Sequence, residues 1–486
     1  MLETIKNQHS KTKNPSQFVV IGGGISGLAA AYRLTTDGVD HDLQVRLLEA
    51  GDRVGGVIGT RREDGFIMEE GPDCFISSKP WALDLCRELG IEDDLEGTNT
   101  EMRKSFIVRG KRLLPIPEGF YLLAPTSFSA LLKTPVFSWP GKLRMAMELL
   151  IPRKREASDE SLEQFVMRRL GREAFERMAQ PMVAGIYTAD PKKLSVQATF
   201  PQFLEWEQEY GSVIRALLKQ GKESTDLSES SGPRYSLFLS FKDGLHTLVE
   251  ALVRKLPNET IRPTATVTGL SRADGGWRIE LSGGDSLDAD AVCIALPSMK
   301  TAELLADSMP ELARALKEIP YLGTISVNLI FDRKQIAHPL DGMGFVVPAV
   351  EGRALLACTF SSIKFFGRAP EGKVLLRAFL GGPERQNLLE QTDEEIGEIV
   401  MNDLAELLDI SGSPDRFHVH RHPASMAQYH LGHLDRIARI ESLIGEVPNL
   451  AIAGNAYHGV GIPDCIHSAQ KASAKLLQFH QRPDSP

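Results

Sequence analysis

A glycine-rich turn near the N-terminus constrains the fold more than any other feature of the sequence. The apolar residues 18–21 (FVVI) lead directly into residues 22–27 (GGGISG), and good helix formers follow over residues 28–34. A second apolar run, residues 45–48, ends on Glu49. Strand, glycine turn, helix, strand and acid in this order are typical of a βαβ unit that binds a dinucleotide. We therefore predict that the turn binds a pyrophosphate at the helix N-terminus and that Glu49 accepts hydrogen bonds from a ribose.

The rest of the chain changes between helical and strand patterns without an internal repeat. Residues 81–220 are largely helical in pattern, with proline-rich breaks between residues 113 and 140. Strand patterns return from residue 261 onward, and a second glycine turn at residues 459–461 opens a last helix. The predicted fold class is α/β (α+β), with a Rossmann-like dinucleotide-binding domain, a mixed-sheet substrate domain and an inserted helical domain.

The predicted domains are discontinuous in sequence. We expect a flexible N-terminal tail at residues 1–16 and a dinucleotide-binding domain built from residues 17–90, 240–300 and 425–480. The helical domain is assigned to residues 91–220, and the substrate-binding domain to residues 221–239 and 301–424.

Charge and cysteine content argue against several classes of function. With 55 Lys and Arg against 64 Asp and Glu, the net charge of −9 disfavours a nucleic-acid binder, which usually carries a basic stripe. The five cysteines show no CxxC or Cys/His spacing, so we expect no metal site and a reducing compartment. The polar N-terminus lacks the apolar stretch of a signal peptide, and no apolar run reaches the length of a spanning helix. We expect a cytoplasmic protein.

A single dinucleotide fingerprint limits the choice of cofactor. Enzymes that pass electrons from a nicotinamide to a flavin on this kind of fold need two nucleotide sites, and no second GxGxxG follows a strand here. A bound FAD, reduced by substrate and reoxidised by oxygen or a quinone, is the simplest design. A nicotinamide-dependent dehydrogenase is the alternative, although the C-terminal glycine turn suits the isoalloxazine end of a long FAD molecule.

Several motifs together resemble the flavin monoamine-oxidase superfamily. They are VVIGGGISGLAAAYRL at the N-terminus, DRVGGVIGT and GFIMEEGPDCF after Glu49, and LAIAGNAYHGVGIPDCIHSAQ at the C-terminus. Within this superfamily, residues 184–201 (AGIYTADPKKLSVQATFP), residues 428–433 (QYHLGH) and GVGIPDC are similar to protoporphyrinogen and coproporphyrinogen oxidases of haem biosynthesis. The similarity covers residues 18–477, which is nearly the whole chain.

The resemblance implies a non-covalent FAD with contacts at both glycine turns. It assigns to the cofactor Gly22, Gly24, Ile25, Ser26 and Gly27 at the pyrophosphate, Glu49 at the ribose, Ala50, Gly55, Gly56, Val57, Gly71 and Pro72 along the molecule, Val267 at the adenine, and Val460, Gly461 and Ile462 under the flavin ring. Asp73 and Leu434 stand where relatives often carry Arg and Trp, so neither is assigned. We expect Cys465, close to the flavin, to be a buried thiol rather than a covalent attachment.

The implied reaction is the six-electron oxidation of a porphyrinogen to the porphyrin, with oxygen as acceptor. The resemblance names no general base and suggests the Gly185 carbonyl for orienting the macrocycle, with a plain helix-end glycine as the alternative. The substrate's propionates should be bound by cations, and the resemblance makes Arg103 and Lys104 the two candidates. The alternative is that both are solvated surface charges. Met343 is a candidate for the apolar wall of the pocket, with core packing as the alternative. The sequence does not distinguish protoporphyrinogen IX from coproporphyrinogen III.

Two other functions stay open at this point. One is a different amine oxidase or a desaturase of the same superfamily, whose pocket would not need cations for carboxylates. The other is a flavin-free binding module like the Rab GDP-dissociation inhibitors, which share the fold. Purified protein that absorbs as a flavin would separate the enzyme from the binding module.

Residues 113–155 suggest a peripheral membrane contact. Apolar residues and prolines there precede a basic fringe at Arg153, Lys154 and Arg155. Such a segment can lie in a bilayer interface without spanning it, so we expect weak, reversible and salt-sensitive association. The alternative is that the apolar positions line the pocket and pack the helical domain. A homodimer is also compatible with the sequence, which does not determine the oligomeric state.

Overall fold

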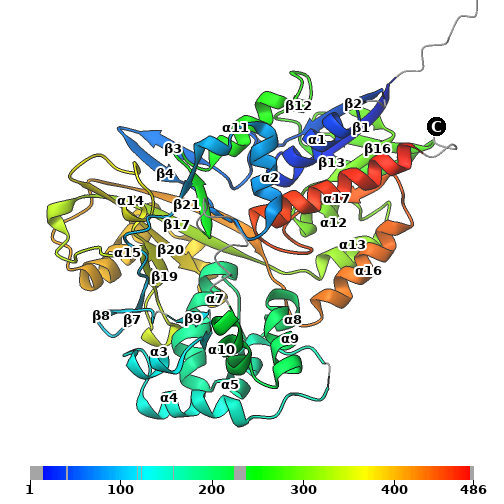
Figure 1. Ribbon diagram of the computed structural model, residues 1–486. Coiled ribbons are helices and arrows are strands. Elements are labelled where there is room, and N and C mark those ends of the chain that lie inside the picture. Colours follow the sequence, from blue (N-terminus) through cyan, green and yellow to red (C-terminus); the bar gives the residue numbers. More distant parts are fainter. Residues whose placement is uncertain are drawn as a thin grey trace, which may run out of the picture.

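The computed structural model describes residues 15–39, 42–117, 119–121, 123–156, 158–223 and 237–481 of the 486-residue chain. Residues 1–14 of the predicted tail and residues 224–236 of the polar stretch lie outside this description. Figure 1 shows three connected regions: a parallel sheet with its helices at the top, a larger sheet at the left, and a helical lobe at the bottom.

A five-stranded parallel sheet forms around the predicted βαβ unit. Its strands lie in the order β12 (Ile261–Arg262), β2 (Leu43–Leu48), β1 (Ser16–Ile21), β16 (Ala291–Ile294) and β22 (Leu450–Ile452). Val20 pairs with Leu47 on one side and with Cys293 on the other, so β1 is the central strand. The sheet therefore joins segments from both ends of the chain (Figure 1).

Both faces of this sheet are covered, because successive residues of a strand point to opposite sides. Phe18 and Val20 belong to the core formed with α1 (Ile25–Asp37), α2 (Pro80–Leu89), α11 (His246–Lys255) and α17 (Ile462–His480). Val19 and Ile21 belong to the core that contains the fully buried Trp277. The elements of that second layer are β13 (Val267–Ala273), β14 (Gly276–Leu281), β15 (Ser286–Ala289), α12 (Ser298–Leu304), α13 (Pro310–Lys317) and α16 (His433–Gly445).

A seven-stranded mixed sheet forms the second region. Its order is β21 (Arg416–Ala427), β17 (Tyr321–Asp332), β20 (Lys373–Gly381), β19 (Leu355–Thr359), β18 (Gly344–Val346), β7 (Phe106–Arg109) and β8 (Arg112–Pro115). The pairing is antiparallel except between β18 and β7. Val327 and Leu329 pack with α15 (Asp393–Leu408). On the opposite face Ile330 packs against the hairpin of β3 (Thr60–Glu63) and β4 (Phe66–Glu69).

Short elements connect these regions. β5 (Phe75–Ile76), β11 (Phe238–Phe241) and β6 (Leu95–Gly97) form a three-stranded sheet, and β9 (Phe120–Tyr121) pairs with β10 (Ala124–Pro125). Helix α14 (Ser361–Lys364) follows β19, and 3₁₀ turns occur at η1 (Glu92–Asp94), η4 (Arg333–Gln335), η5 (Ala349–Glu351) and η6 (Gln386–Glu390).

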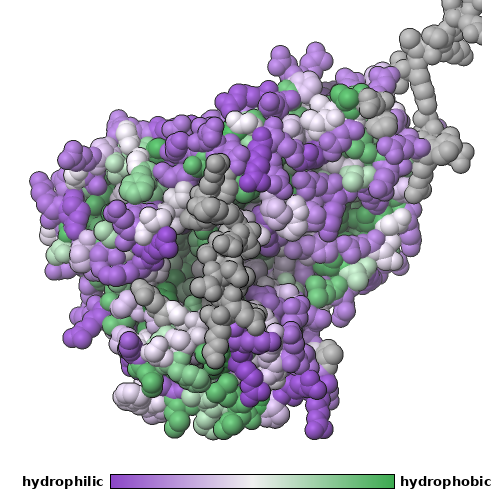
Figure 2. All heavy atoms as spheres, viewed as in Figure 1, coloured by the Kyte–Doolittle hydropathy of each residue, from purple (hydrophilic) through white to green (hydrophobic). Residues whose placement is uncertain are grey.

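The helical lobe begins later than the sequence predicts. Residues 106–115, inside the predicted helical range 91–220, form β7 and β8 and pair into the seven-stranded sheet. The helices are α3 (Phe128–Lys133), α4 (Trp139–Ala146), η2 (Met147–Leu150), α5 (Leu162–Arg169), α6 (Arg172–Ala174), η3 (Phe175–Ala179), α7 (Gln180–Tyr187), α8 (Val196–Thr199), α9 (Pro201–Tyr210) and α10 (Val213–Glu223). Figure 2 shows a recess with hydrophobic walls between this lobe and the seven-stranded sheet.

A π-helical turn joins α6 to α7. The turn η3 ends at Ala179, two residues before Pro181, which has no backbone N–H to donate within a regular α-helix. The wider turn accommodates the proline without ending the helix. This continuity carries the chain to Gly185 and Tyr187 at the end of α7.

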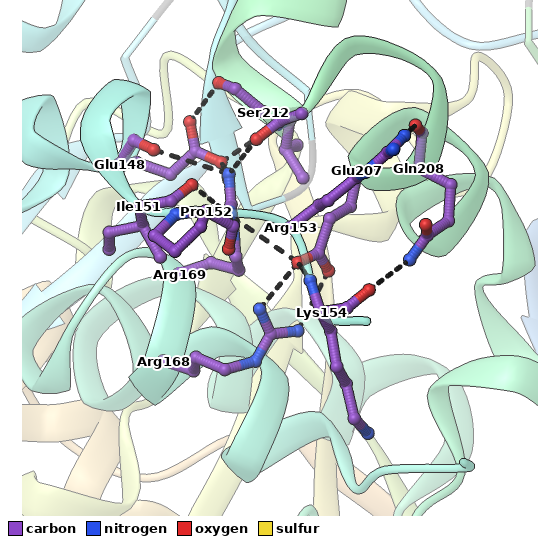
Figure 3. Close-up of polar contacts among 12 residues, drawn as sticks. Glu148, Ile151, Pro152, Arg153, Lys154, Arg168, Arg169, Glu207, Gln208 and Ser212 are labelled. Carbon is purple, nitrogen blue, oxygen red and sulfur yellow. Dashed lines mark hydrogen bonds and ion pairs between the residues drawn. The ribbon is translucent and has the colours of Figure 1, made fainter. Parts of the chain in front are cut away.

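Buried charges hold the helical lobe together (Figure 3). Arg169 of α5 and Glu148 of η2 form an ion pair with no exposed surface. The Glu148 carboxylate also accepts hydrogen bonds from the Ser212 hydroxyl and from the Val213 N–H (2.9 Å), so it caps α10. Arg168 bridges the carboxylates of Glu207 (2.6 Å) and Glu160 (2.7 Å).

Candidate cofactor and substrate site

The turn between β1 and α1 leaves space where the sequence predicts a pyrophosphate. Gly22 has φ +104°, and a Cβ there would lie 2.6 Å from the Ala295 carbonyl oxygen, so only glycine fits. Gly24 has φ −69°, and a Cβ there would meet no heavy atom within 4 Å. The space lies at the N-terminus of α1, whose first N–H groups lack intrahelical acceptors. Gly24, Ile25 and Ser26 therefore border a site suited to an anion.

Glu49 lies beside this turn, as the fingerprint requires. One carboxylate oxygen accepts from the Gly23 N–H and the other from the Gly51 N–H, each at 2.7 Å. Each oxygen has a further lone pair, so the carboxylate can also accept from a ribose hydroxyl. The Glu49 carbonyl accepts from the Ala265 N–H (2.8 Å), which brings the segment before Val267 to the same place.

The next two predicted segments continue from the pyrophosphate turn. The Gly55 N–H donates to the Gly23 carbonyl (2.8 Å), which places Gly55, Gly56 and Val57 beside the first turn. A Cβ on Gly71 would lie 1.8 Å from the Val57 carbonyl oxygen, so the Gly71–Pro72 turn lies directly against this loop. Residues 22–27, 55–57 and 71–72 therefore form one continuous surface. Ala50 is exposed at the start of the loop.

The C-terminal turn places a second helix N-terminus beside the first. Gly461 is the N-cap of α17, and Ile462 is buried below it. The Ser26 hydroxyl and the Cys465 thiol form a hydrogen bond, so α1 and α17 begin side by side. Burial raises the pKa of Cys465 to about 12, so the thiol is uncharged. Asp464 pairs with Lys79 at 2.6 Å.

Tyr429, which the sequence analysis did not single out, supports this second turn. Its hydroxyl accepts from the Gly459 N–H (2.7 Å) and donates to the Asn455 carbonyl (2.8 Å). Its ring stacks on His433 at 3.9 Å, and Nε2 of His433 donates to the Tyr457 carbonyl (3.0 Å). The motif QYHLGH contains both rings, but nothing in a linear motif shows what they contact.

The C-terminal histidines, which are close in sequence, have separate partners. His422 bonds to the Glu70 carbonyl, His458 pairs with Glu441 at 2.7 Å, and His467 stacks on Trp81 at 4.0 Å. Across the described ranges, no group of three His, Cys, Asp or Glu side chains could hold a metal ion.

The three predicted substrate residues lie together. The Met343 N–H donates to the Lys104 carbonyl at 2.7 Å, which places Met343 beside Arg103 and Lys104. The Lys104 ammonium pairs with Asp341 at 3.1 Å. Arg103 is exposed and forms no ion pair with any other described residue. Of the two cations, Arg103 is therefore the freer to meet a carboxylate.

Asp73 has an ion-pair partner instead of a cofactor role. Its carboxylate pairs with Lys364 at 2.8 Å, and this ammonium holds the pKa of Asp73 well below its usual range. The Lys364 carbonyl accepts from the Asn99 N–H (2.9 Å). The segment that carries Arg103 is thus connected to the Gly71–Pro72 turn through one ion pair.

Gly185 lies in α7, close to the C-terminal turn. It is exposed, and a Cβ there would meet no heavy atom within 4 Å. Two residues later, the Tyr187 ring lies 6.3 Å from that of Tyr429. The structure thus places Gly185, the predicted macrocycle contact, near the C-terminal turn that Tyr429 supports and that carries the predicted flavin contacts.

Comparisons with known proteins agree with this geometry. The model of the family described as flavin containing amine oxidoreductase matches residues 25–477. The chain belongs to this family. It is 35% identical to the coproporphyrinogen III oxidase of Bacillus subtilis (strain 168), over 95% of this chain and 98% of the relative. It is 31% identical to protoporphyrinogen oxidase 1, chloroplastic, of Arabidopsis thaliana, over 96% of this chain and 88% of the relative.

A solved structure extends the similarity to three dimensions. A protein from Exiguobacterium sp. 255-15, whose name places it among the protoporphyrinogen oxidases, superposes with a TM-score of 0.84 at 32% identity. The alignment covers 95% of this chain and 98% of that one. The chain is therefore a member of the flavin-containing amine oxidoreductase family with FAD as its cofactor, and the predicted fold class is confirmed.

The residues at both turns fit FAD. The space at Gly24 is the volume a Cβ would fill, and two helix N-termini, at Ile25 and Ile462, offer unpaired N–H groups along one surface. Glu49 keeps lone pairs for a ribose. The close approach of α1 and α17 at Ser26 and Cys465 is what lets one extended cofactor reach both turns.

Proposed function

We propose that this member of the family oxidises a porphyrinogen to the porphyrin in haem biosynthesis, with coproporphyrinogen III as the preferred substrate and oxygen as the acceptor. The observation that carries the proposal is the end-to-end similarity to a coproporphyrinogen III oxidase, at 35% identity and 98% coverage of that relative. The similarity to a protoporphyrinogen oxidase is lower, at 31% and 88%.

The reaction removes six electrons and six protons from the macrocycle. Bound FAD would supply a two-electron acceptor for each of three successive oxidations, in which three molecules of oxygen would take up the six electrons and six protons as three molecules of hydrogen peroxide. The protein has to hold a flat apolar macrocycle, exclude water and bind propionates. Met343 offers an apolar side chain and Arg103 a free guanidinium from the same edge of the seven-stranded sheet. The N-terminus of α17 offers a positive dipole where charge accumulates.

A comparison of substrates tests the proposal. The purified protein should absorb as a flavin at about one FAD per chain and convert coproporphyrinogen III to fluorescent coproporphyrin, with a higher kcat/KM than for protoporphyrinogen IX. Oxygen consumption should be three per porphyrin formed. A flavin-loaded protein that oxidises a primary amine but neither porphyrinogen would overturn the proposal in favour of an amine oxidase. A higher kcat/KM for protoporphyrinogen IX would reverse the substrate preference.

We further propose that the helical lobe contacts the cytoplasmic face of a membrane. Large apolar side chains are exposed on consecutive elements of the lobe, and we call this set the apolar face: Phe128 and Leu132 of α3, Trp139 and Leu143 of α4, and Met147 and Leu150 of η2. Trp139 is 69% exposed and Leu150 81%, values unusual for such residues. Figure 2 shows hydrophobic residues gathered at the bottom of the lobe. None of the helices in the described ranges has the length and apolarity needed to cross a bilayer.

The basic fringe is smaller than the sequence suggests. Arg153 donates to the Gln208 carbonyl (3.0 Å), and the Lys154 ammonium donates to the Ser158 carbonyl (2.9 Å), so these charges are partly used within the lobe. Lys133 and Arg155 are exposed beside the apolar face and can meet anionic headgroups. Hydrophobic contact, with a smaller ionic contribution, is thus the expected mode of association.

Flotation with anionic liposomes tests this contact. Wild-type protein should float at low salt and less at high salt, and Leu143→Glu/Leu150→Glu should abolish flotation. Val350→Glu, at an exposed apolar position on η5, is the matched control and should float like wild type. A wild-type protein that stays at the bottom at low salt would refute the membrane contact. Light scattering on the same proteins tests the alternative that the apolar face binds a second copy of this chain. In that case wild-type protein should be a dimer, and Leu143→Glu/Leu150→Glu should be a monomer.

A further inference from the structure

The turn that is predicted to contact FAD is held by side chains of the seven-stranded sheet. Three successive carbonyls of this turn accept hydrogen bonds from that sheet. Asn328 Nδ2 donates to the Glu69 carbonyl at 2.9 Å. Ser326 Oγ (2.9 Å) and His422 Nε2 (2.8 Å) both donate to the Glu70 carbonyl. Arg377 donates to the Gly71 carbonyl. We call Ser326, Asn328, Arg377 and His422 the donor set.

The donor set forms a polar patch on one face of the seven-stranded sheet, and the same face carries hydrophobic residues elsewhere. Its members come from three neighbouring strands, β17, β20 and β21, and Asn328 pairs directly with Arg377. Asn328 is 0%, Arg377 2% and Ser326 3% exposed. Farther along the same face, Ile330 and Leu375 pack against the hairpin as plain hydrophobic residues. The polar residues thus occur where the sheet meets the turn.

Arg377 is the most costly member to bury. No described carboxylate forms an ion pair with it, and its Nε has no hydrogen-bond partner among the described residues. The carboxylates of Asp73 and Glu69 lie near enough to interact with the guanidinium electrostatically, although neither forms a direct ion pair with it. Its hydrogen bond goes to the carbonyl of Gly71, a predicted FAD contact.

The Gly71–Pro72 turn contacts the loop of residues 55–59, which lies at the pyrophosphate end of the site. Gly71 touches the Val57 carbonyl, and the Glu70 N–H donates to the Gly59 carbonyl at 2.8 Å. The Gly55 N–H in turn donates to the Gly23 carbonyl. A shift of the Gly71–Pro72 turn therefore displaces the loop of residues 55–59, which lies against the glycine turn.

We propose that the donor set acts as a group of positioning residues, which fix the Gly71–Pro72 turn from the substrate side so that it fits FAD. The inference rests on the proposed placement of FAD along residues 22–27, 55–57 and 71–72. Since FAD binding follows from family membership, it does not depend on which substrate is oxidised. A protein that holds FAD but oxidises no porphyrinogen would refute the proposed function and leave this inference standing.

The Glu70 carbonyl gives the sharpest test, because two side chains share it. We would prepare the holoenzyme with Ser326→Ala, His422→Leu and both changes together. His418→Leu is the control: His418 lies on the same strand, opposite Asn328, and makes no hydrogen bond to the turn. FAD release after dilution is followed by the rise in free-flavin fluorescence, and the visible spectrum reports the flavin environment.

The expected result is a graded one. Each single variant keeps one donor and should release FAD about twofold to fivefold faster, and the double variant about tenfold or more, in line with the loss of two hydrogen bonds. The flavin bands of the double variant should move toward those of free FAD, and Ser326→Thr, which keeps the hydroxyl, should behave as wild type. Release and spectrum unchanged in the double variant, or changed equally by His418→Leu, would overturn the proposal.

Discussion

Gly24 is the residue at which FAD binding can be removed with the least damage to the protein. Its φ of −69° suits any L-residue, and a Cβ would meet no protein atom within 4 Å. We predict that Gly24→Val folds normally and does not retain FAD, because the side chain occupies the pyrophosphate space. Flavin absorbance per chain and circular dichroism measure the two effects. A fully flavin-loaded Gly24→Val would show that the turn has been misassigned.

The neighbouring Gly22 provides a contrast. It has φ +104° and lies against the Ala295 carbonyl, so Gly22→Ala should lower thermal stability as well as flavin content. The two variants together separate loss of the cofactor from loss of the fold.

Arg103 should carry most of the carboxylate recognition predicted for the pair Arg103 and Lys104. Lys104 already pairs with Asp341, whereas Arg103 has no ion pair with another described residue. We predict that Arg103→Met raises KM for porphyrinogen about tenfold, the range for one charge-assisted hydrogen bond, and that Lys104→Met changes it less. The flavin spectrum should be unchanged in both. A KM within about twofold of wild type in the double variant would place the carboxylate site elsewhere.

For single residues, the sequence predicted that the glycines of the first turn and Glu49 lie together, because the motif fixes backbone geometry within a short segment. Tyr429, Asn328 and Arg377 were missed for a physical reason. Their hydrogen-bond acceptors lie 26 residues away for Tyr429, 259 for Asn328 and 306 for Arg377. No local pattern encodes such a partner.

At the scale of elements, breaking a buried ion pair of the helical lobe should be strongly destabilising. Arg169→Met would leave the Glu148 carboxylate fully buried without its cation. Breaking a buried pair in this way costs about 3–5 kcal/mol, so we predict a loss of this size in the free energy of unfolding. Urea denaturation followed by circular dichroism measures it.

An exposed pair on the next helix serves as the control. Arg172 and Glu176 are 3.4 Å apart with 74% and 32% of their side chains exposed. Arg172→Met should change the free energy of unfolding by about 0.5 kcal/mol or less. Equal losses in the two variants would contradict the distinction between buried and exposed pairs.

The elements that the sequence predicted best have strong periodicity or strong caps. Within the strand patterns predicted from residue 261 onward, residues 277–281 lie within β14 and residues 325–330 lie within β17. The sequence placed β7 and β8 in the predicted helical range because each has only four residues, and β8 is partly exposed and ends on Pro115. Their place is set by pairing with β18, more than 200 residues later, which the local sequence does not reveal.

For the molecule as a whole, buried histidines should make stability fall in acid. Burial lowers the pKa of His433 to about 4, with nearby Arg436, His458 and His430 acting in the same direction. The unfolded imidazole titrates near pH 6.5. Between these values only the unfolded chain binds the proton, so the free energy of unfolding decreases as pH falls from about 6.5 to about 4 and levels off below. Each pKa unit contributes about 1.4 kcal/mol.

Replacing His433 isolates its share of this pH dependence. His433→Gln keeps an N–H donor for the Tyr457 carbonyl but does not titrate. Urea unfolding at pH 7 and pH 5 should therefore show a smaller loss of stability for the variant than for wild type. The same loss in both proteins would mean that His433 is protonated in the folded state or that other groups dominate.

The parallel sheet of five strands has a consequence for how the protein is made. Its central strand β1 leaves the ribosome first, while the edge strand β22 and helix α17, which completes the cofactor surface beside Ser26, come last. At a synthesis rate of roughly 5–20 residues per second, α17 emerges on the order of tens of seconds after the first glycine turn. During this time Leu28 and Leu34 have no α17 to cover them, so the nascent chain exposes apolar surface that chaperones can bind. The surface that is predicted to bind FAD is therefore complete only after α17 has been released and has packed beside α1.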